Sequence, residues 1–471
     1  MIRTYNHKHD INKEKQEKVL FVVRAYRKSC TIISRHQWRL FYEGDGFDKM
    51  IETKDIVAPV SERYKRNCCY QVDGSLKSFI ANRQNDFVKM VYASSLDTKT
   101  RKHLFQINRR KLWFKKVHGK FTQEELFLAR KIFKHILSLH RKPSFRHANM
   151  LLNKNVAEII IANKTQSVEF DYWIKLSTLE KGKPIMLPIR KNPYFEKLSG
   201  ELQQAVQINF GDKKEITIGL MKDLPAKLIV FKTDILSVDI GLKNLFALNN
   251  GDIFGRNFYL KLRHYDFILT ELAKNRQRQG LKIRSKKYDL LVRRLKNWIK
   301  NEVRRLLNRI VKLYAPKKIV IEHLDFRNQN LSKWMNRLLC NFGKGEIIKK
   351  LDSLEEEFGI IYQEIPAPYT SQECPNPECG YIDEKNRPTQ EKFKCKCCGY
   401  TRNADIVGSR NGLARSSDKE LSVIYLSRKL ILQTLVMRFL ERHPRLSSRA
   451  NGLLLGNPYF KDYLSQPKMV A

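Results

Sequence analysis

Four of the nine cysteines are paired at the spacing of a metal site. Cys374 and Cys379 form one pair and Cys395 and Cys398 the other, with fifteen residues between the two pairs. Gly-Tyr follows each pair, and a glycine turn at this place lets backbone N–H groups face the sulfur atoms. Tetrahedral Zn²⁺ accepts four thiolates, so we predict a zinc ribbon with these four cysteines as its ligands.

Other roles for these thiols are less favoured. Cys397 would replace Cys395 or Cys398 only at a poorer spacing, and we expect it to be a spare. A disulfide pair or unrelated buried thiols are weaker alternatives, because paired spacings of this kind are typical of zinc in an intracellular protein. The remaining thiols are expected to pack in the core or to have no function: Cys30, Cys68, Cys69 and Cys340. This cysteine usage predicts a protein of the reducing cytoplasm.

Three acids stand where a fold of alternating strands and helices would bring them together. Asp239 lies near the end of the apolar segment 235–241, and Glu322 ends the apolar segment 318–322. Asp405 follows the last ribbon cysteine by seven residues, at the expected start of a helix. Carboxylates this close repel one another unless divalent cations neutralise them, and Mg²⁺ prefers oxygen ligands. We therefore predict a magnesium site at Asp239, Glu322 and Asp405.

The expected chemistry of such a site is hydrolysis of a phosphodiester. Two ions about 3.5–4 Å apart would bind the scissile phosphate, one activating water and the other stabilising the leaving 3′-oxygen. Single acids at strand ends are more often caps or ion-pair partners, so the order of the three carries the prediction rather than any one alone. Asp252 and Asp325 are weaker candidates for the same site.

The elements that would position these acids follow a recognisable order. Three short strands are expected at 235–241, 245–248 and 252–254, and a long amphipathic helix spans Leu291 to Leu313. A strand at 318–322, a helix at 346–358 and a strand at 359–363 precede the ribbon, and a last helix begins near Asp405. The order β-β-β-α-β-α-β, then ribbon and helix, is the ribonuclease H-like topology.

The N-terminal half has a different character. Apolar and basic residues alternate at loose helical spacing in 12–41 and 76–92, and Thr122 to Glu125 is a capping box that predicts a helix from Gln123 to about His140. From about 156 to 231 the pattern alternates instead, as in 168–176, 206–210, 216–218 and 228–230, which indicates a small sheet or barrel. Pro184 and Pro188 flank an expected edge strand. The chain is thus predicted to be an α+β multidomain protein.

Charge identifies the class of partner. The 471 residues include 90 Lys and Arg against 48 Asp and Glu, a net charge of +42. This excess would repel itself without a polyanion, so nucleic acid is the expected partner, ahead of ribosome-like or membrane-surface binding. We expect no membrane span or signal peptide. The segment 256–318 is the most basic, and its helix would expose a positive ridge, formed by Arg294, Arg304, Arg305 and Arg309, although a merely solvated surface is the alternative.

The segments SVDIG, IVIEHLDF, TSQ-EC…CGY, FKCKCCGY and NADIVGSRN resemble the RuvC-type nuclease of TnpB proteins and of miniature type V CRISPR effectors. The resemblance covers about residues 231–415 and is thin before them. It implies an RNA-guided DNA endonuclease that binds a guide RNA and cleaves matched target DNA beside a short flanking motif, in a prokaryotic cytosol, with Mg²⁺ at the three acids and Zn²⁺ at the four cysteines. The implied layout is a first wedge strand at 1–11, a helical recognition lobe at 12–145, a wedge-like β domain at 146–230, the nuclease at 231–369 and 401–415, a target-binding zinc ribbon at 370–400 and a helical tail at 416–471.

Two departures from the family keep alternatives open. The third family motif often reads Asp-x-Asn-Ala-Ala, whereas Val407, Gly408 and Ser409 occupy its last three positions here. An arginine often precedes the third ribbon cysteine by four residues, where this chain has Glu391, and Arg387 would serve as the phosphate contact instead. The alternatives are a guided DNA-binding protein that does not cut, such as a repressor or transposition accessory, and a nuclease without a guide, such as a junction resolvase.

The tail after residue 415 is not explained by the resemblance. Its capping box, Ser417 to Glu420, predicts an amphipathic helix to about Arg442. This helix would serve as a packing element, an RNA-binding appendage or the contact of a homodimer.

Overall fold

The chain forms two structural units, Met1–Pro225 and Ala226–Ala471. The computed structural model describes residues 1–44, 46–47, 53, 56–161, 169–210, 215–324, 331–444 and 448–464. Within these residues, the helices are all too short or too polar to cross a bilayer.

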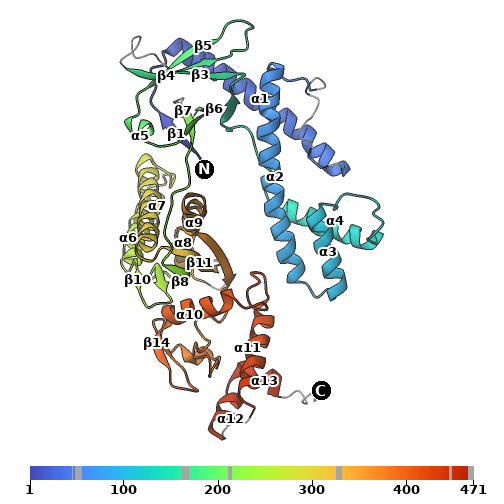
Figure 1. The fold of residues 1–471 in the computed structure, drawn as a ribbon, viewed down its shortest axis with the longest axis vertical. Coiled ribbons are helices and arrows are strands. Elements are labelled where there is room, and N and C mark those ends of the chain that lie inside the picture. The colour runs from blue at the N-terminus through green and yellow to red at the C-terminus, as the bar shows by residue number, and fades with distance from the viewer. Residues whose placement is uncertain are drawn as a thin grey trace. The chain divides into compact units, whose positions relative to one another are not determined.

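The first unit contains a helical part built on two long helices, α1 (Lys13–Glu43) and α2 (Glu62–Tyr92), followed by α3 (Thr98–Arg110) and α4 (Gln123–Ser138) (Figure 1). The side chain of Asn12 caps α1, and Gly44 ends it with a left-handed φ of 97°. The capping box of Thr122 and Glu125 is present as predicted. α2 begins fourteen residues before the predicted Leu76, because small and polar residues in its first turns still pack against α1.

Two antiparallel sheets make up the rest of this unit. One has the order β1 (Ile2–His7), β7 (Ile216–Asp223), β6 (Glu201–Phe210), β2 (Met150–Asn153), and the other β3 (Ala157–Ile161), β4 (Phe170–Leu176), β5 (Ile185–Arg190). The first strand of the chain therefore pairs with the last strand of the unit. A single turn of helix, α5 (Pro193–Glu196), precedes β6. β5 lies at the edge of its sheet and contains Pro188, and an edge position suits proline because proline has no backbone N–H to donate to a second neighbouring strand. Val168, the first residue of the predicted alternating segment 168–176, falls outside the described residues.

A mixed five-stranded sheet is the centre of the second unit. Its order is β10 (Ile253–Phe254), β9 (Phe246–Leu248), β8 (Thr233–Asp239), β11 (Pro316–His323), β12 (Ile361–Pro366). The first three strands pair antiparallel, and β8, β11 and β12 run parallel. The predicted strand at 228–230 is wrong: Leu228 and Val230 are exposed in an irregular segment after Pro225, and in the described part of the chain the backbone of 228–230 pairs with no strand.

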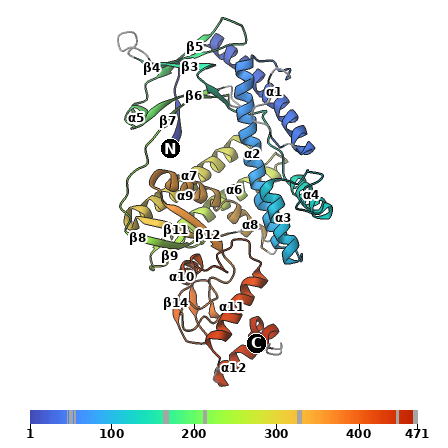
Figure 2. The ribbon, with the colours of Figure 1, turned by 45° about the vertical axis from the view of Figure 1, so that its right-hand side comes forward.

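Helices cover both faces of this sheet. α6 (Phe258–Arg278), α7 (Lys286–Tyr314), α8 (Lys333–Cys340) and α9 (Lys344–Phe358) lie on one side and α10 (Ala404–Ser416) on the other (Figures 1 and 2). Leu236 and Val238 of β8 join the core beneath α7, together with Ile319 and Ile321 of β11. Because side chains alternate along a strand, Ser237, Asp239, Val320 and Glu322 face α10 instead.

The ribbon and tail complete the second unit. They contain the short helix η2 (Glu384–Asn386), the hairpin of β13 (Lys392–Lys394) and β14 (Thr401–Asn403), and the helices α11 (Arg428–Arg442), α12 (Ser448–Leu455) and α13 (Pro458–Leu464). The helix predicted from Ser417 begins at Arg428 instead, with Ser427 as its cap. Asp418 accepts hydrogen bonds from the N–H groups of Glu420 and Leu421 but also binds Arg438, so it closes a turn rather than starting a helix.

We predict that Gly412→Ala destabilises the second unit. Gly412 lies where α10 meets the sheet, and an added Cβ would stand 2.7 Å from Ser237 Oγ and 3.3 Å from Ile365 Cδ1. Overpacking at such a contact costs about 1–3 kcal/mol of unfolding free energy. Calorimetry should show a lower melting temperature, and the additional change Ser237→Ala should recover part of it.

Gly345→Ala is the matched control, because among the described residues a Cβ at this helical position meets no atom within 4 Å apart from its chain neighbours and the backbone of its own helix. It should leave the melting temperature unchanged or raise it slightly. Equal melting of both glycine variants would contradict the close packing of α10.

Candidate active site

The three predicted acids meet on the face of the sheet that α10 covers. In the parallel pair of β8 and β11, Val320 lies beside Ser237, so Asp239 and Glu322, two residues further on, project from the same end of the same face. α10 packs on β8 and β11. A Cβ at Gly408 would stand 3.3 Å from the Asp239 carboxyl carbon, and this small residue is what allows the helix to approach the acid so closely. The structure thus brings together acids from two strands and one helix.

Asp405 stands in the first turn of α10, where the macrodipole favours a negative charge. The Asn403 side chain caps this helix by accepting hydrogen bonds from the N–H groups of Asp405 and Ile406. Asn244, in the loop after β8, donates a hydrogen bond of 2.9 Å to Asp405 Oδ2. Arg387 of the ribbon lies 3.6 Å from Asp405 Oδ1. Both carboxylate oxygens therefore have a partner from another segment.

The other two acids are in an environment that disfavours their charge. Burial, reinforced by the nearby Glu322 and Asp405, raises the pKa of Asp239 well above its usual range. Burial also raises the pKa of Glu322, although a hydrogen bond from Thr370 and the Arg415 guanidinium oppose the shift. A carboxyl whose pKa is raised on folding favours the folded state at low pH, and this contribution is lost as pH rises through the folded pKa.

The residues present fit a divalent cation on three observations. Glu322 is 8% exposed, and among the described residues its Oε1 has no hydrogen-bond partner. Burial and the neighbouring acids raise the pKa values of Glu322 and Asp239 despite the nearby arginines, and a bound cation would supply further positive charge. The donor set is all oxygen, as Mg²⁺ prefers. In the described part of the chain these carboxylates do not form a group with every ligand atom within 4.8 Å, so gathering around a cation requires them to move inward.

A ring of contacts ties the ribbon to the acids. Arg387 Nη1 donates to Ser371 Oγ at 2.9 Å, and its Nε donates to the carbonyl oxygen of Gln390 at 3.0 Å. Ser371 belongs to the linker between β12 and the ribbon, and Asn411 of α10 donates hydrogen bonds to the carbonyl oxygens of Thr370 and Glu373 in the same linker. The ribbon arginine, the linker and α10 are therefore fixed to one another beside Asp405.

Arg415 closes this ring from the end of α10. It is 2% exposed, donates to the carbonyl oxygens of Pro366 and Pro368 at 3.1 and 2.7 Å, and forms an ion pair with Glu373 at 3.0 Å. These partners offset the cost of burying the charge, although among the described residues Arg415 Nε has no hydrogen-bond partner. Asn244, Ser371, Asn411 and Arg415 were not predicted to belong to the site. The only available signal was the spacing of four residues between Asn411 and Arg415, which puts them on one side of the helix that begins near Asp405.

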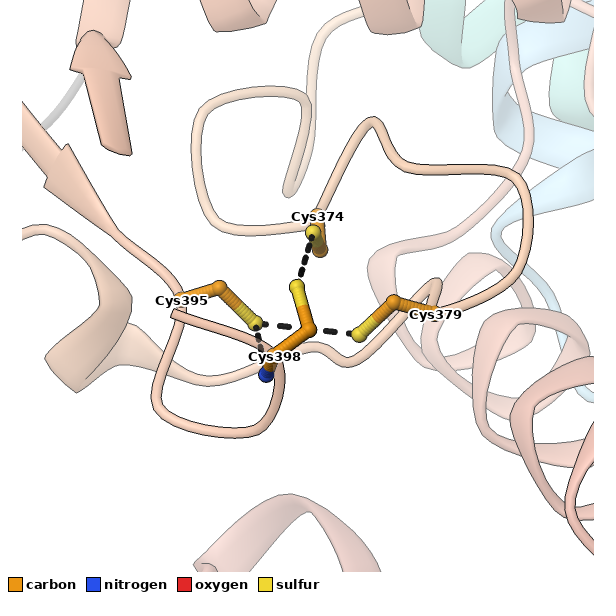
Figure 3. A group of neighbouring side chains, drawn as sticks. All are labelled: Cys374, Cys379, Cys395 and Cys398. Carbon is orange, nitrogen blue, oxygen red and sulfur yellow. Dashed lines mark hydrogen bonds between the residues drawn. The ribbon is translucent and has the colours of Figure 1, made fainter. Parts of the chain in front are cut away.

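The four predicted zinc ligands point toward one another from two turns (Figure 3). The Sγ atoms of Cys374 and Cys398 lie 3.6 Å apart and those of Cys379 and Cys395 3.7 Å apart, and all four lie within 4.8 Å of one another. Hydrogen bonds from the neighbouring thiols hold the pKa of Cys379 well below its usual range. Cys397 is outside the group, and burial raises its pKa to about 12. The donor set is that of a closed tetrahedral zinc site.

The C-terminal helices share a hydrophobic core with this ribbon. Tyr381 stacks on Phe460 at 5.7 Å, and Phe439 meets both rings. Asn457 is 1% exposed and donates hydrogen bonds to Tyr381 Oη and to the carbonyl oxygen of Ile382. His443 Nε2 contacts the carbonyl oxygen of Cys379 at 3.1 Å, directly beside the cluster of four cysteines. The tail thus has the first of its three expected roles, packing against the ribbon.

The remaining predicted residues lie apart from the acids or outside the described chain. Arg294, Arg304, Arg305 and Arg309 are exposed on α7, and Arg305 pairs bidentately with Glu302. Glu391 forms an ion pair of 2.9 Å with Lys243. Asp252 accepts hydrogen bonds from Tyr314 and Asn250, and Asp325 is not among the described residues.

Residues 345–412 match the family model of the Cas12f1-like TNB domain. The predicted resemblance to TnpB and miniature type V effectors is confirmed. The Cas12f1-like segment contains the four cysteines, Arg387 and Asp405, and it extends from α9 through most of α10. The ribbon and the helix that covers the sheet are therefore parts of one recognised segment.

Curated relatives match over limited lengths. The chain is 42% identical over 84 residues to the CRISPR-associated endodeoxyribonuclease Cas12f1 of Sulfoacidibacillus thermotolerans, 18% of this chain and 19% of the relative. It is 26% identical over 200 residues to InsQ of Escherichia coli K12, named as a proposed RNA-guided DNA endonuclease, which covers 38% of this chain and 48% of that protein. It is 38% identical over 81 residues to a TnpB-like protein of Aquifex aeolicus, 17% of this chain and 23% of that one. The matches thus span less than half of each relative.

Among solved structures, a complex of Cas12f1 with guide RNA and target DNA aligns with 87% of this chain and 98% of its own, at 14% identity and a TM-score of 0.43.

We predict that the purified protein binds one Zn²⁺ per chain through the four clustered cysteines. Cys374→Ser and Cys395→Ser should each lose the metal and lower the melting temperature, because an incomplete thiolate set leaves the ribbon without its tetrahedral site. Metal content by mass spectrometry and melting by calorimetry test this. Cys397→Ser is the control and should retain zinc. Loss of zinc in this control, or a zinc-free wild-type protein with all thiols oxidised, would contradict the assignment of the four cysteines as zinc ligands.

Proposed function

We propose that this protein is an RNA-guided DNA endonuclease with a single RuvC-type site formed by Asp239, Glu322 and Asp405. The observation that carries the proposal is the convergence of these acids under α10, directly beside a ribbon arginine. The sheet order β10-β9-β8-β11-β12, with three antiparallel strands followed by two parallel ones, supports a ribonuclease H-like nuclease domain. The names of the curated relatives support the same activity.

In this proposal the three acids would hold Mg²⁺, which supplies positive charge for the in-line displacement of a phosphodiester when bound. The chain provides the positioning. Asn244 holds one oxygen of Asp405, so the carboxylate presents a defined face to the site. Arg387 lies at the mouth of the site with its side chain 28% exposed, and we infer that it contacts the phosphate of the scissile strand. Its bonds to Ser371 and Gln390 aim it from the ribbon.

The proposed nucleic-acid partners are inferred from the net charge and from the division of the chain into two units. A net charge of +42 supports a long polyanion, which we infer to be a guide RNA paired with target DNA. The helices and sheets of Met1–Pro225 would act as the recognition and wedge domains, with base pairing giving the sequence specificity and the protein reading a short flanking motif. The exposed arginines of α7 would contact backbone phosphates. Four reduced thiolates suit the prokaryotic cytosol.

A guided protein that does not cut is the second candidate. It is favoured by the third motif, where Val407 is fully buried and leaves no polar side chain at the position that the family often fills with asparagine. In that case the acids would keep their places but bind divalent cations too weakly for turnover.

We predict that Asp239→Asn lowers cleavage by about 100-fold or more, because removing one preorganised charge from a site of this kind has that effect. The assay is Mg²⁺-dependent linearisation of a plasmid that carries a sequence matched to the RNA that copurifies. Asp252→Asn is the control and should cleave at the wild-type rate, because this carboxylate is engaged by Tyr314 and Asn250.

Three other outcomes separate the alternatives. Cleavage that persists in Asp239→Asn would rule out this site. Guide-directed binding of the plasmid without cleavage by the wild-type protein would favour the second candidate. Cutting by protein stripped of all RNA would favour a nuclease that needs no guide.

A further inference from the structure

A groove between α6 and α8 is not used by the proposed active site. Its volume is about 560 Å³, within the range of ligand pockets. The side chains that line it come from one face of α6 and from two positions of α8. Those relevant here are Leu260, Phe267, Trp334, Arg263, Lys274 and Arg337.

Large apolar side chains are exposed in this groove. Phe267 is 65% exposed, Leu260 60% and Trp334 37%. Leu260 and Phe267 are seven residues apart and share a stripe with Arg263 and Lys274, whereas Phe258 and Leu262 of the same helix are buried in the core. α6 therefore has one face that holds it to the domain and a second, aromatic face that is open to solvent. Exposed apolar patches bordered by charge are typical of binding sites.

The floor of the groove is held rigid by an ion pair. Arg337 of α8 binds Asp266 of α6 bidentately, with Nε–Oδ1 and Nη2–Oδ2 distances of 3.1 and 3.2 Å. Asp266 is 8% exposed, so this contact fixes the two helices beneath the aromatic rings. The groove is preformed, and binding in it carries little cost of ordering.

The charges of the groove favour a nucleic acid that presents its bases. Both acids in the lining are compensated, Asp266 by Arg337 and Glu271 by Lys274 at 2.9 Å, and Arg263 leaves one positive charge in excess. The surrounding segment 256–318 has 20 Lys and Arg against 4 Asp and Glu. A second copy of this chain, with its own +42, would be repelled from this surface.

We propose that this groove binds unpaired bases of single-stranded nucleic acid, which stack on Phe267 and Trp334 while Arg263 contacts an adjoining phosphate. Aromatic platforms of this kind bind bases of any sequence, whereas a duplex keeps its bases stacked on one another. The polymer class rests on the proposed function, and either an unpaired guide segment or a displaced DNA strand has the required chemistry. The binding itself does not depend on cleavage.

The test uses the full-length protein, freed of copurified nucleic acid and assayed without added Mg²⁺. The probe is a single-stranded oligonucleotide that contains 2-aminopurine, in DNA and RNA forms, with a duplex of the same sequence for comparison. The wild-type protein should quench the 2-aminopurine of the single strands. Phe267→Ala combined with Trp334→Ala should abolish the quenching and weaken single-strand binding by about 10-fold or more. Phe267→Tyr combined with Trp334→Phe should restore both, which excludes misfolding as the cause.

Met437→Ala is the control, because Met437 is 46% exposed on α11 of the same unit and is not part of the groove lining. Its affinity should equal that of the wild type. The relative affinities of the DNA and RNA probes identify the source of the strand. Unchanged affinity in the double alanine variant overturns the proposal, as does an equal loss for the duplex. A wild-type dimer that Phe267→Ala converts to a monomer without any change in oligonucleotide affinity overturns it in favour of self-association.

Discussion

Repulsion among three carboxylates that the fold gathers beneath one helix is the constraint on which the second unit depends. Asp239 and Glu322 project from neighbouring parallel strands, and α10 places Asp405 over them. Their mutual repulsion and their burial both disfavour ionisation, as the raised pKa values of Asp239 and Glu322 record. The close contact of α10 with the sheet at Gly408 and Gly412 permits this arrangement, and Arg387 and Arg415 partly offset the negative charge.

The surrounding elements can be understood as responses to this charge. Arg387 and Asn244 each hold one oxygen of Asp405. Arg415 is buried behind Glu322 and at the same time fastens the linker that leads into the ribbon. In the proposed function, Zn²⁺ at the four cysteines would make the ribbon rigid, and a rigid ribbon would hold Arg387 in place beside the acids. The C-terminal helices extend this rigid body, since Asn457 and Phe439 fill the back of the ribbon.

Much of this site was predictable because its signals are local and chemical. The spacing of Cys374, Cys379, Cys395 and Cys398 is set by the geometry of a tetrahedral ion, and acids at the ends of apolar segments stand out against their neighbours. The ring formed by Ser371, Asn411 and Arg415 was not predictable, because its bonds join backbone carbonyl groups whose positions exist only after folding. The same limit explains two errors outside the site. The apolar residues 228–230 have the pattern of a strand, but in the described residues no neighbouring strand pairs with them. The segment from Ser417 to Glu420 has the pattern of a capping box, but Asp418 binds Arg438, which is twenty residues further along the chain.

The central claim is that the three acids form one cation site, and binding of Mn²⁺ in place of Mg²⁺ tests it without requiring guide, target or turnover. Electron paramagnetic resonance titration of the zinc-loaded protein should detect Mn²⁺ binding that is lost in Asp239→Asn and in Asp405→Asn but kept in Asp252→Asn. The same ion should raise the melting temperature at pH 8, because it relieves the repulsion that disfavours the ionised acids. Failure of the wild-type protein to bind Mn²⁺, or equal binding by all four proteins, would contradict the account.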